Sequence, residues 1–559
     1  MLQFRNTAFI LCLALPWLNP FAPGPSAAVL PWLVSLACVG ALLLVAPATR
    51  LPKAFTMFLI SACAYFITVW GLKGYQNSVE VLATVLALAC AVLCAMVGRG
   101  LHCPAVPSSG CNVQWLAGTW LVVALLSCAM ALCQYFGVEH WFAPWVSQAG
   151  DGTAFANLRQ RNQFATLTGV GLLALVYLQT AVQTATAQTF AQMPVQSSVT
   201  AALLRLWPCA ALLLLAAGNA ATASRTGVVQ WLLLAGLGWC WRSSLAPPAR
   251  RMLLLAVPAY AAMAVAMPLL AALADQATGN LLTRMADTTG GGRVALYSNV
   301  WDLIVQQPWL GWGWRELAYA HYAQHFDNRF PMILDNAHNL PLHLAVELGA
   351  PFALMVCGAL VWWVLRNQPW REDQPQRQLA WGVLLLVGVH SLTEYPMWYG
   401  PFLMATGLCV GLLCKPLKLQ NKALAKVFIA PAALFLIAFT SYAGWDYYRV
   451  SQIYLPPEAR NAAYADNTLA KAQGSWLFGR QARFAELVTT PVTRQTAPRV
   501  LALAADLVHY SPEPRIIQAL IESSTALHLD DVAMFHLSRF KDVFPQDYAA
   551  WSVPVKPAP

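Results

Sequence analysis

The chain has 559 residues, of which 58% are hydrophobic and only 10% are charged. Ordinary soluble domains are about 25% charged, so this composition excludes a purely soluble fold. It equally excludes a collagen, a coiled coil, a disordered chain and a small disulfide scaffold. The formal net charge of +10 could indicate a nucleic-acid partner, so the positions of the Lys and Arg residues have to be considered.

Apolar runs of span length recur along most of the chain, which predicts an all-α polytopic membrane protein. The spans are expected at about 5–22, 27–46, 54–72, 79–98, 114–136, 163–183, 205–221, 226–242, 251–273, 340–365, 378–396, 400–414 and 427–444. The first run is short and broken by prolines, so a cleaved signal peptide is the alternative interpretation of that run.

The basic residues between the spans are distributed asymmetrically. If the N-terminus is cytoplasmic, fifteen Lys and Arg residues fall in the inner loops and four fall in the short outer loops. This is the positive-inside pattern. The positive net charge is therefore a topology signal, and we expect no nucleic-acid partner.

Two large segments then lie outside, at about 274–339 and 445–559, and neither contains a cysteine although the chain has 14. Export to an oxidising periplasm explains this, because free thiols would cross-link there. The predicted organisation is N-terminal membrane helices over 1–273, a periplasmic loop over 274–339, C-terminal membrane helices over 340–444 and a periplasmic tail over 445–559.

The loop and the tail are both expected to contain helices. In the loop, a Gly290-Gly291-Gly292 hinge precedes an amphipathic stretch over 294–306, which predicts a partly helical lid or rim. In the tail, Pro512 and Pro545 end two similar stretches 33 residues apart. That spacing approaches a tetratricopeptide-like helix pair without its W, G and Y pattern, so a small helical domain is predicted. Docking of a partner and capping of the membrane part both remain open as its role.

Arginines gather at the outer face. Inserting a charged side chain in a span costs roughly 2.5 to 3.5 kcal/mol, so arginines at these positions indicate a function. They are Arg225, in a tight turn between two spans, Arg293 after the triple glycine, and Arg159 and Arg161, which have Gln160, Asn162 and Gln163 beside them. Each could anchor a helix end or form an ion pair. Together they favour a diphosphate ligand, because guanidinium groups bind phosphate oxygens through paired charge-assisted hydrogen bonds.

A histidine precedes the tenth span. Pro341 fits only the first turn of a helix, so that helix should begin near Asn339 or Leu340, with His338 at its mouth. An imidazole there could accept a proton from a hydroxyl nucleophile. A capping or packing histidine is the alternative.

Two His–Glu pairs, four residues apart, lie inside the spans and could be buried ion pairs or proton relays. They are His343 with Glu347 and His390 with Glu394. Tyr395 follows Glu394 at the outer end of its span, where a substrate could reach it.

Other chemistry is poorly supported. His321 and His325 could bind a metal, but no carboxylate triad or cysteine lies nearby. Gly311-Trp312-Gly313-Trp314 lacks the surroundings of a dinucleotide site and fits an interfacial aromatic turn. We therefore expect neither a cofactor nor a metal.

The ordered set of motifs resembles a known family. The stretch from Gly292-Arg293 through Pro308-Trp309-Leu310-Gly311-Trp312-Gly313 to His338-Asn339 and Glu347-Leu348-Gly349 is similar to the core of the bacterial O-antigen ligase and polymerase superfamily. The stretches over 159–163 and 390–399 are similar to its protein O-oligosaccharyltransferases, the pilin-glycosylation ligase type. The resemblance covers most of residues 150–415. Ala154-Phe155-Ala156-Asn157 departs from the Gly-rich lead of the relatives.

The resemblance implies a GT-C-like bundle of about 12–13 transmembrane helices in the bacterial inner membrane, with its active site and tail in the periplasm. It implies a glycosyltransferase that moves a glycan from undecaprenyl diphosphate to Ser or Thr hydroxyls of pilin or other periplasmic proteins. It places the essential histidine on His338 and the diphosphate-binding arginines on Arg225 and Arg293. Membrane lipid is a further partner, and the lipid tail is expected between spans near Trp309, Trp312 and Trp314.

The chemistry expected from these residues is a single inverting displacement without a metal. Arg159 and Arg161 would assist in binding the diphosphate. Gln160, Asn162, Gln163, Asn339, Glu394 and Tyr395 would support the site or face the acceptor. Ligation to lipid A–core, polymerisation of glycan repeats, and transport of a lipid-linked sugar are the alternatives.

Overall fold

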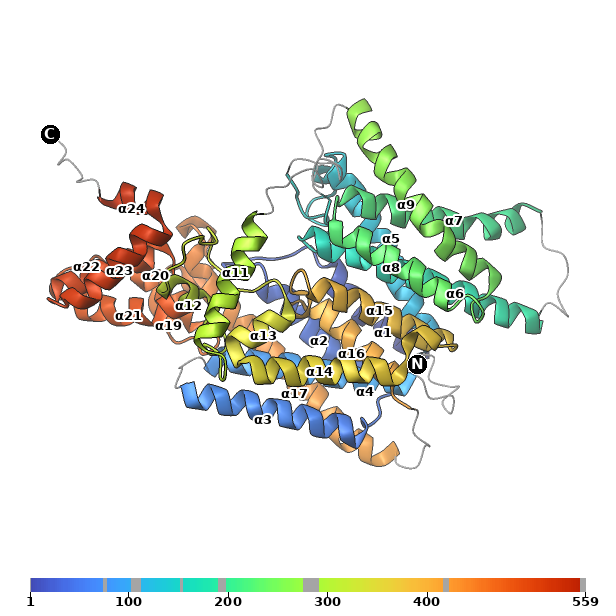
Figure 1. Cartoon of the computed structure of the whole chain (residues 1–559), viewed down its shortest axis with the longest axis horizontal. Coiled ribbons are helices and arrows are strands. Elements are labelled where there is room, and N and C mark those ends of the chain that lie inside the picture. Colours follow the sequence, from blue (N-terminus) through green and yellow to red (C-terminus); the bar gives the residue numbers. More distant parts are fainter. Residues whose placement is uncertain are drawn as a thin grey trace.

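The computed structural model describes residues 2–73, 78–101, 112–150, 154–189, 198–274, 291–415 and 422–552. Within these ranges all regular elements are helices, and no strand occurs (Figure 1). The prediction of an all-α polytopic membrane protein is therefore confirmed.

The predicted spans correspond to helices with similar bounds. In chain order they are α1 (Leu2–Leu18), α2 (Val29–Val45), α3 (Lys53–Lys73), α4 (Ser78–Leu101), α5 (Val113–Tyr135), α6 (Arg161–Thr189), α7 (Ser198–Ala221), α8 (Arg225–Cys240), α9 (Pro247–Leu273), α13 (Leu340–Leu348), α14 (Ala350–Asn367), α15 (Pro375–Ser391), α16 (Gly400–Leu413) and α17 (Lys422–Ser451). Among the described residues, seven helices are long and apolar enough to cross a membrane, and shorter apolar helices accompany them.

The tenth predicted span is not one helix but two. Gly349 adopts φ +90° and separates α13 from α14. A Cβ atom on Gly349 would lie 2.1 Å from the carbonyl oxygen of Trp309, so no other residue fits without displacing that segment. The break lets the chain around Trp309 pack against the end of α13.

Small residues allow the membrane helices to approach closely. A Cβ on Gly98 of α4 would lie 2.1 Å from the Leu408 carbonyl oxygen, and one on Gly411 of α16 would lie 2.1 Å from the Ala95 carbonyl oxygen. Backbone contact of this kind is typical of helix pairs in membranes, where packing replaces the hydrophobic effect as the driving force.

The loop between α9 and α13 contains α11 (Gly291–Gln306) and α12 (Leu317–Ala323). The amphipathic stretch is thus helical, as predicted. Gly290 lies outside the described residues, and Gly291 and Gly292 form the first turn of α11 instead of a hinge. In Figure 1, α11 runs across the direction of α3 and α14.

The tail is helical throughout its described part. Its helices are α18 (Ala462–Ala465), α19 (Thr468–Gln473), α20 (Gly479–Thr489), α21 (Ala497–Tyr510), α22 (Pro514–Ala526), α23 (Asp530–Val543) and α24 (Pro545–Ser552). Tyr322 of α12 is buried in the same apolar cluster as α21, α22 and α23. The loop and the tail therefore share a core.

Candidate active site

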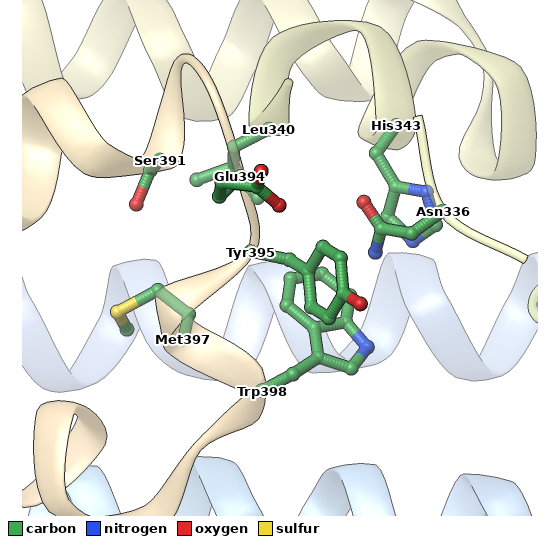
Figure 2. A pocket seen from close by; sticks show the side chains of 8 residues that line it. All are labelled: Asn336, Leu340, His343, Ser391, Glu394, Tyr395, Met397 and Trp398. Carbon is green, nitrogen blue, oxygen red and sulfur yellow. The ribbon is translucent and has the colours of Figure 1, made fainter. Parts of the chain in front are cut away.

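Several segments that are far apart in the sequence converge near His338. They are the segment before α13, the turn between α15 and α16, the residues that enter α6, the turn between α7 and α8, and the start of α11. Figure 2 shows Glu394 and Tyr395 projecting from the turn after α15 beside Asn336, Leu340 and His343 of the opposite segment.

The closest polar contact at this site joins His338 to Glu394. The imidazole Nδ1 lies 2.7 Å from the carboxylate Oε2. Because a carboxylate accepts, Nδ1 carries the proton and Nε2 is left as the basic nitrogen. The His338 side chain is 29% exposed and that of Glu394 is 14% exposed, so the histidine is the member of the pair that a substrate can reach.

The backbone holds His338 in an unusual conformation. Its φ is +49°, a left-handed value that side chains with a Cβ seldom adopt. The Asn336 side chain accepts a hydrogen bond from the His338 amide at 2.9 Å. On the other side, Asn339 caps α13 by accepting from the Leu342 amide at 3.1 Å, and it donates to the Leu392 carbonyl at 3.1 Å. The expected helix start is confirmed, with Asn339 as its N-cap.

Asn162 connects Glu394 to a third segment. Its side-chain amide nitrogen donates to Glu394 Oε1 at 3.2 Å, and its oxygen accepts from the Ser224 hydroxyl at 2.7 Å. The Ser224 oxygen in turn accepts from the Gly227 amide at 3.1 Å and so caps α8. One amide therefore links the carboxylate beside His338 to the helix terminus that carries Arg225.

Arg293 approaches the same carboxylate oxygen as Asn162. Its Nη2 is 3.7 Å from Glu394 Oε1, and its side chain is 53% exposed. Arg225 is the first residue of α8, directly after the Ser224 cap, and its side chain is also exposed. The structure thus brings Arg293 into contact with the His338–Glu394 pair and places Arg225 one residue from the Asn162 network.

The other residues of the segment that enters α6 lie in or before its first turn. The Arg159 guanidinium donates to the Pro20 carbonyl. The Gln160 side chain accepts from the Gln163 amide at 2.8 Å and so closes the first turn of α6. Arg161 begins α6 and Gln163 is buried. These hydrogen bonds hold the segment in place and are not directed at His338.

Tyr395 forms an aromatic wall beside the histidine. Its ring meets the His338 ring edge to face, with centroids 5.1 Å apart, and stacks on Tyr399 at 6.0 Å. Glu394 and Tyr395 also line a small pocket that includes the buried His343.

The His390–Glu394 pair expected from helical spacing does not form. The Glu394 carboxylate is bonded to His338 and Asn162, while His390 Nδ1 lies 2.9 Å from the Thr166 hydroxyl. The side chains of the other pair are close together, with His343 Nε2 at 3.5 Å from Glu347 Oε2.

His321 and His325 do not share a site. His321 Nε2 lies 3.1 Å from the Asn299 side-chain oxygen, and His325 Nδ1 lies 3.3 Å from Asp542. Burial lowers the pKa of His321 to about 3. Over the part of the chain that the structure describes, no group of three or more His, Cys, Asp or Glu residues could hold a metal ion.

Sequence reasoning missed two residues that organise the site, Ser224 and Asn336. Ser224 had a signal, because a Ser before the first apolar residue of a helix is a typical N-cap. Asn336 also had a signal, because an Asn side chain often accepts a hydrogen bond from the backbone amide two residues later, in an Asx turn.

Models of three known protein families match much of this region. Residues 154–178 match the protein glycosylation ligase model, and residues 210–357 match the O-antigen ligase model. Residues 378–559 match the model described as virulence factor membrane-bound polymerase, C-terminal. These ranges contain Asn162, Arg225, Arg293, His338 and Glu394.

A curated relative agrees with these matches. The chain is 26% identical over 298 residues to a general O-oligosaccharyltransferase of Acinetobacter baylyi. The aligned residues make up 52% of this chain and 49% of the relative. The chain thus spans about half the length of that relative. The chain is therefore a polytopic membrane protein that is similar, over separate stretches, to O-antigen ligases and protein glycosylation ligases.

Proposed function

We propose that this protein is an O-oligosaccharyltransferase that moves a glycan from undecaprenyl diphosphate to Ser or Thr hydroxyls of exported proteins, pilin among them. The observation that carries the proposal is the pairing of His338 with Glu394 at 2.7 Å, with the Arg293 guanidinium 3.7 Å from the same carboxylate. A base and a cation side by side are what displacement of a diphosphate by an alcohol requires. The similarity to a general O-oligosaccharyltransferase supports the acceptor class.

In the proposed reaction, His338 Nε2 takes the proton of the acceptor hydroxyl while the hydroxyl oxygen attacks the anomeric carbon of the glycan. The bond from that carbon to the diphosphate oxygen breaks, and the electron pair leaves with the lipid diphosphate. Glu394 keeps the imidazole in the reactive tautomer and stabilises the imidazolium that forms. A single displacement of this kind inverts the anomeric configuration.

The arginines act on the leaving group. Negative charge grows on the diphosphate as the bond breaks, so Arg293 and Arg225 bind the transition state more strongly than the ground state. Arg159 and Arg161 are proposed to extend this cationic surface on the donor side. In this proposal the positive charge is supplied by side chains, and no metal has a role.

We further propose that the protein lies in the bacterial inner membrane with His338 and the tail on the periplasmic side. The distribution of Lys and Arg between the predicted loops supports this orientation. The cysteine-free sequence over 274–339 and 445–559 supports it independently.

The proposal can be tested by co-expression with a pathway that makes one defined undecaprenyl-diphosphate glycan. Mass spectrometry of the exported proteins should find the intact glycan on Ser or Thr residues, and its loss when the chain is deleted. If exported proteins carry no glycan while the lipid-linked donor accumulates in the membrane, the proposal is wrong.

Ligation to lipid A–core or polymerisation of glycan repeats is the second candidate function. The matches to O-antigen ligase and membrane-bound polymerase models favour it. The same cells distinguish the two, because a ligase or polymerase would leave the glycan on lipid A–core or as longer lipid-linked chains.

A further inference from the structure

α11 begins at the candidate site but exposes an apolar stripe that the proposed reaction does not use. Val294, Trp301 and Val305 lie at helical spacing on one face and are 68%, 59% and 60% exposed. A polar stripe lies beside it, formed by the exposed Ser298, Asp302 and Gln306. The third side of the helix, which includes Leu296, Val300 and Leu303, is buried in an apolar cluster shared with residues of α3, α12, α13 and α14. A helix with one side on protein, one apolar side and one polar side fits a boundary between lipid and water.

The contacts at the end of α11 set its depth relative to the membrane helices. The Tyr65 hydroxyl of α3 donates to the carbonyl oxygens of Trp309 and Leu348 at 3.4 and 3.2 Å. The Ala350 amide, at the start of α14, donates to the Pro308 carbonyl at 2.8 Å. The chain just after α11 therefore lies at the level where α14 begins.

That level is close to the hydrocarbon boundary. α14 has 18 residues, which rise about 27 Å at about 1.5 Å per residue, close to the hydrocarbon thickness of about 30 Å. Leu72 of α3, seven residues beyond Tyr65, is still apolar and 67% exposed. Trp309 is 75% exposed at this level, as expected of a tryptophan in an interfacial belt.

We infer that α11 and Trp309 form an interfacial segment whose apolar stripe lies among the acyl chains of the leaflet on the His338 side. The helix orientation supports this placement, because α11 runs across the direction of the membrane helices in Figure 1. The other two tryptophans expected near the lipid donate hydrogen bonds within the protein: Trp312 Nε1 to the Leu303 carbonyl at 2.9 Å, and Trp314 Nε1 to the Thr84 hydroxyl at 2.9 Å.

The inference has a consequence that rests on the proposed function. Arg293 lies in the first turn of α11 and contacts Glu394. A helix anchored in the leaflet fixes the height of this guanidinium, so that it meets the diphosphate of a donor whose lipid tail lies in the same leaflet.

Photolabelling of the intact protein tests the placement without any glycan transfer. The protein is reconstituted in nanodiscs that contain phosphatidylglycerol with a diazirine on its acyl chain, illuminated and mapped by mass spectrometry. We expect label on residues 294–309 at a level comparable to α14, with little on α23, whose Met534 is exposed to a similar degree at 62%. Label no higher on 294–309 than on α23 would overturn the inference.

A second arm separates bulk lipid from the donor. If undecaprenyl diphosphate with a diazirine in its chain labels residues 294–309 and the phospholipid does not, the stripe is a donor-specific surface and the inference is wrong. The double variant Trp301→Gln, Val305→Gln should lose phospholipid labelling, whereas the matched variant Met534→Gln, Phe535→Gln should keep it. Labelling that survives the first double variant would also contradict the inference.

The functional consequence is checked separately. In nanodiscs, the Trp301→Gln, Val305→Gln variant should raise KM for the lipid-linked donor more than it lowers kcat. The labelling can behave as expected while neither the unmodified protein nor any variant transfers glycan. In that case the proposed function is wrong and the interfacial placement of α11 stands.

Discussion

His338 is held by contacts from three directions. Its amide is bonded to Asn336, its Nδ1 to Glu394, and its ring lies against Tyr395. The positive φ of +49° costs on the order of 1 to 3 kcal/mol, which the surrounding bonds must offset. Strain that is maintained in this way is common at reactive sites, so the backbone supports the role proposed for the side chain.

The importance of the carboxylate can be measured with Glu394→Gln. This variant keeps the shape of the side chain but removes the charge that favours an imidazolium. We expect kcat for glycan transfer to fall by roughly 10² to 10⁴-fold, measured with purified protein in nanodiscs. A value close to that of the unmodified protein would mean that Glu394 does not support His338.

Asn162 should act through Glu394 and not on the substrate. Asn162→Ala removes a hydrogen bond to a charged group, worth about 1.5 to 3 kcal/mol, so kcat should fall by about 10- to 100-fold with little change in KM. A fall in kcat that only follows a loss of folded protein, measured by thermal stability, would indicate a merely structural role.

The sequence located most of this site at residue level but assigned one pair wrongly. His338, Asn339, Arg225 and Arg293 were singled out because helix-start rules and the cost of buried charge act locally. Glu394 was paired with His390 because the two are four residues apart. α15 ends at Ser391, so Glu394 lies in a turn where helical spacing no longer applies, and its partner comes from another segment.

At the level of helices, the bounds were predicted best where one apolar run forms one helix. The prediction of a single helix over 340–365 was wrong, because the break between α13 and α14 depends on a tertiary contact. Gly349 has a positive φ, and the Gly313 amide donates to the Glu347 carbonyl at 3.0 Å. Composition alone cannot reveal that a loop will pack against the middle of an apolar run.

Histidines join the tail to the loop, which predicts a response to pH. His536 Nδ1 lies 2.9 Å from the Tyr322 hydroxyl. Burial, reinforced by His509, lowers the pKa of His536 to about 4. An unfolded histidine titrates near about 6.5. The stability that His536 contributes is therefore present above about pH 6.5 and is lost as the pH falls toward 4.

Hydrogen exchange of α21, α22 and α23 at pH 7.5 and pH 5 would measure this effect. Protection should decrease at the lower pH in the unmodified protein. In His536→Asn, which cannot titrate, protection should be lower at pH 7.5 and should depend less on pH. Equal pH dependence in both proteins would exclude His536 as the responsible group.

Over the whole molecule, the tail is joined to the membrane helices at more than one place. Arg480 of the tail pairs with Glu80 of α4. Asp446, near the end of α17, accepts from Ser475 and Leu477 of the tail at 2.8 and 3.0 Å. The match over residues 378–559 likewise runs from α15 through the tail. These connections join the tail firmly to the membrane part, which favours the capping role that the sequence left open beside docking.

His338 has the central role in the proposed mechanism, as the base that activates an acceptor hydroxyl. The direct test is a single-turnover assay with purified protein, a defined undecaprenyl-diphosphate glycan and a Ser-containing acceptor, read by mass spectrometry. His338→Ala should abolish transfer without loss of folded protein, whereas His325→Ala, at an exposed histidine of the same loop that pairs with Asp542, should transfer normally. Undiminished transfer by His338→Ala would contradict the account.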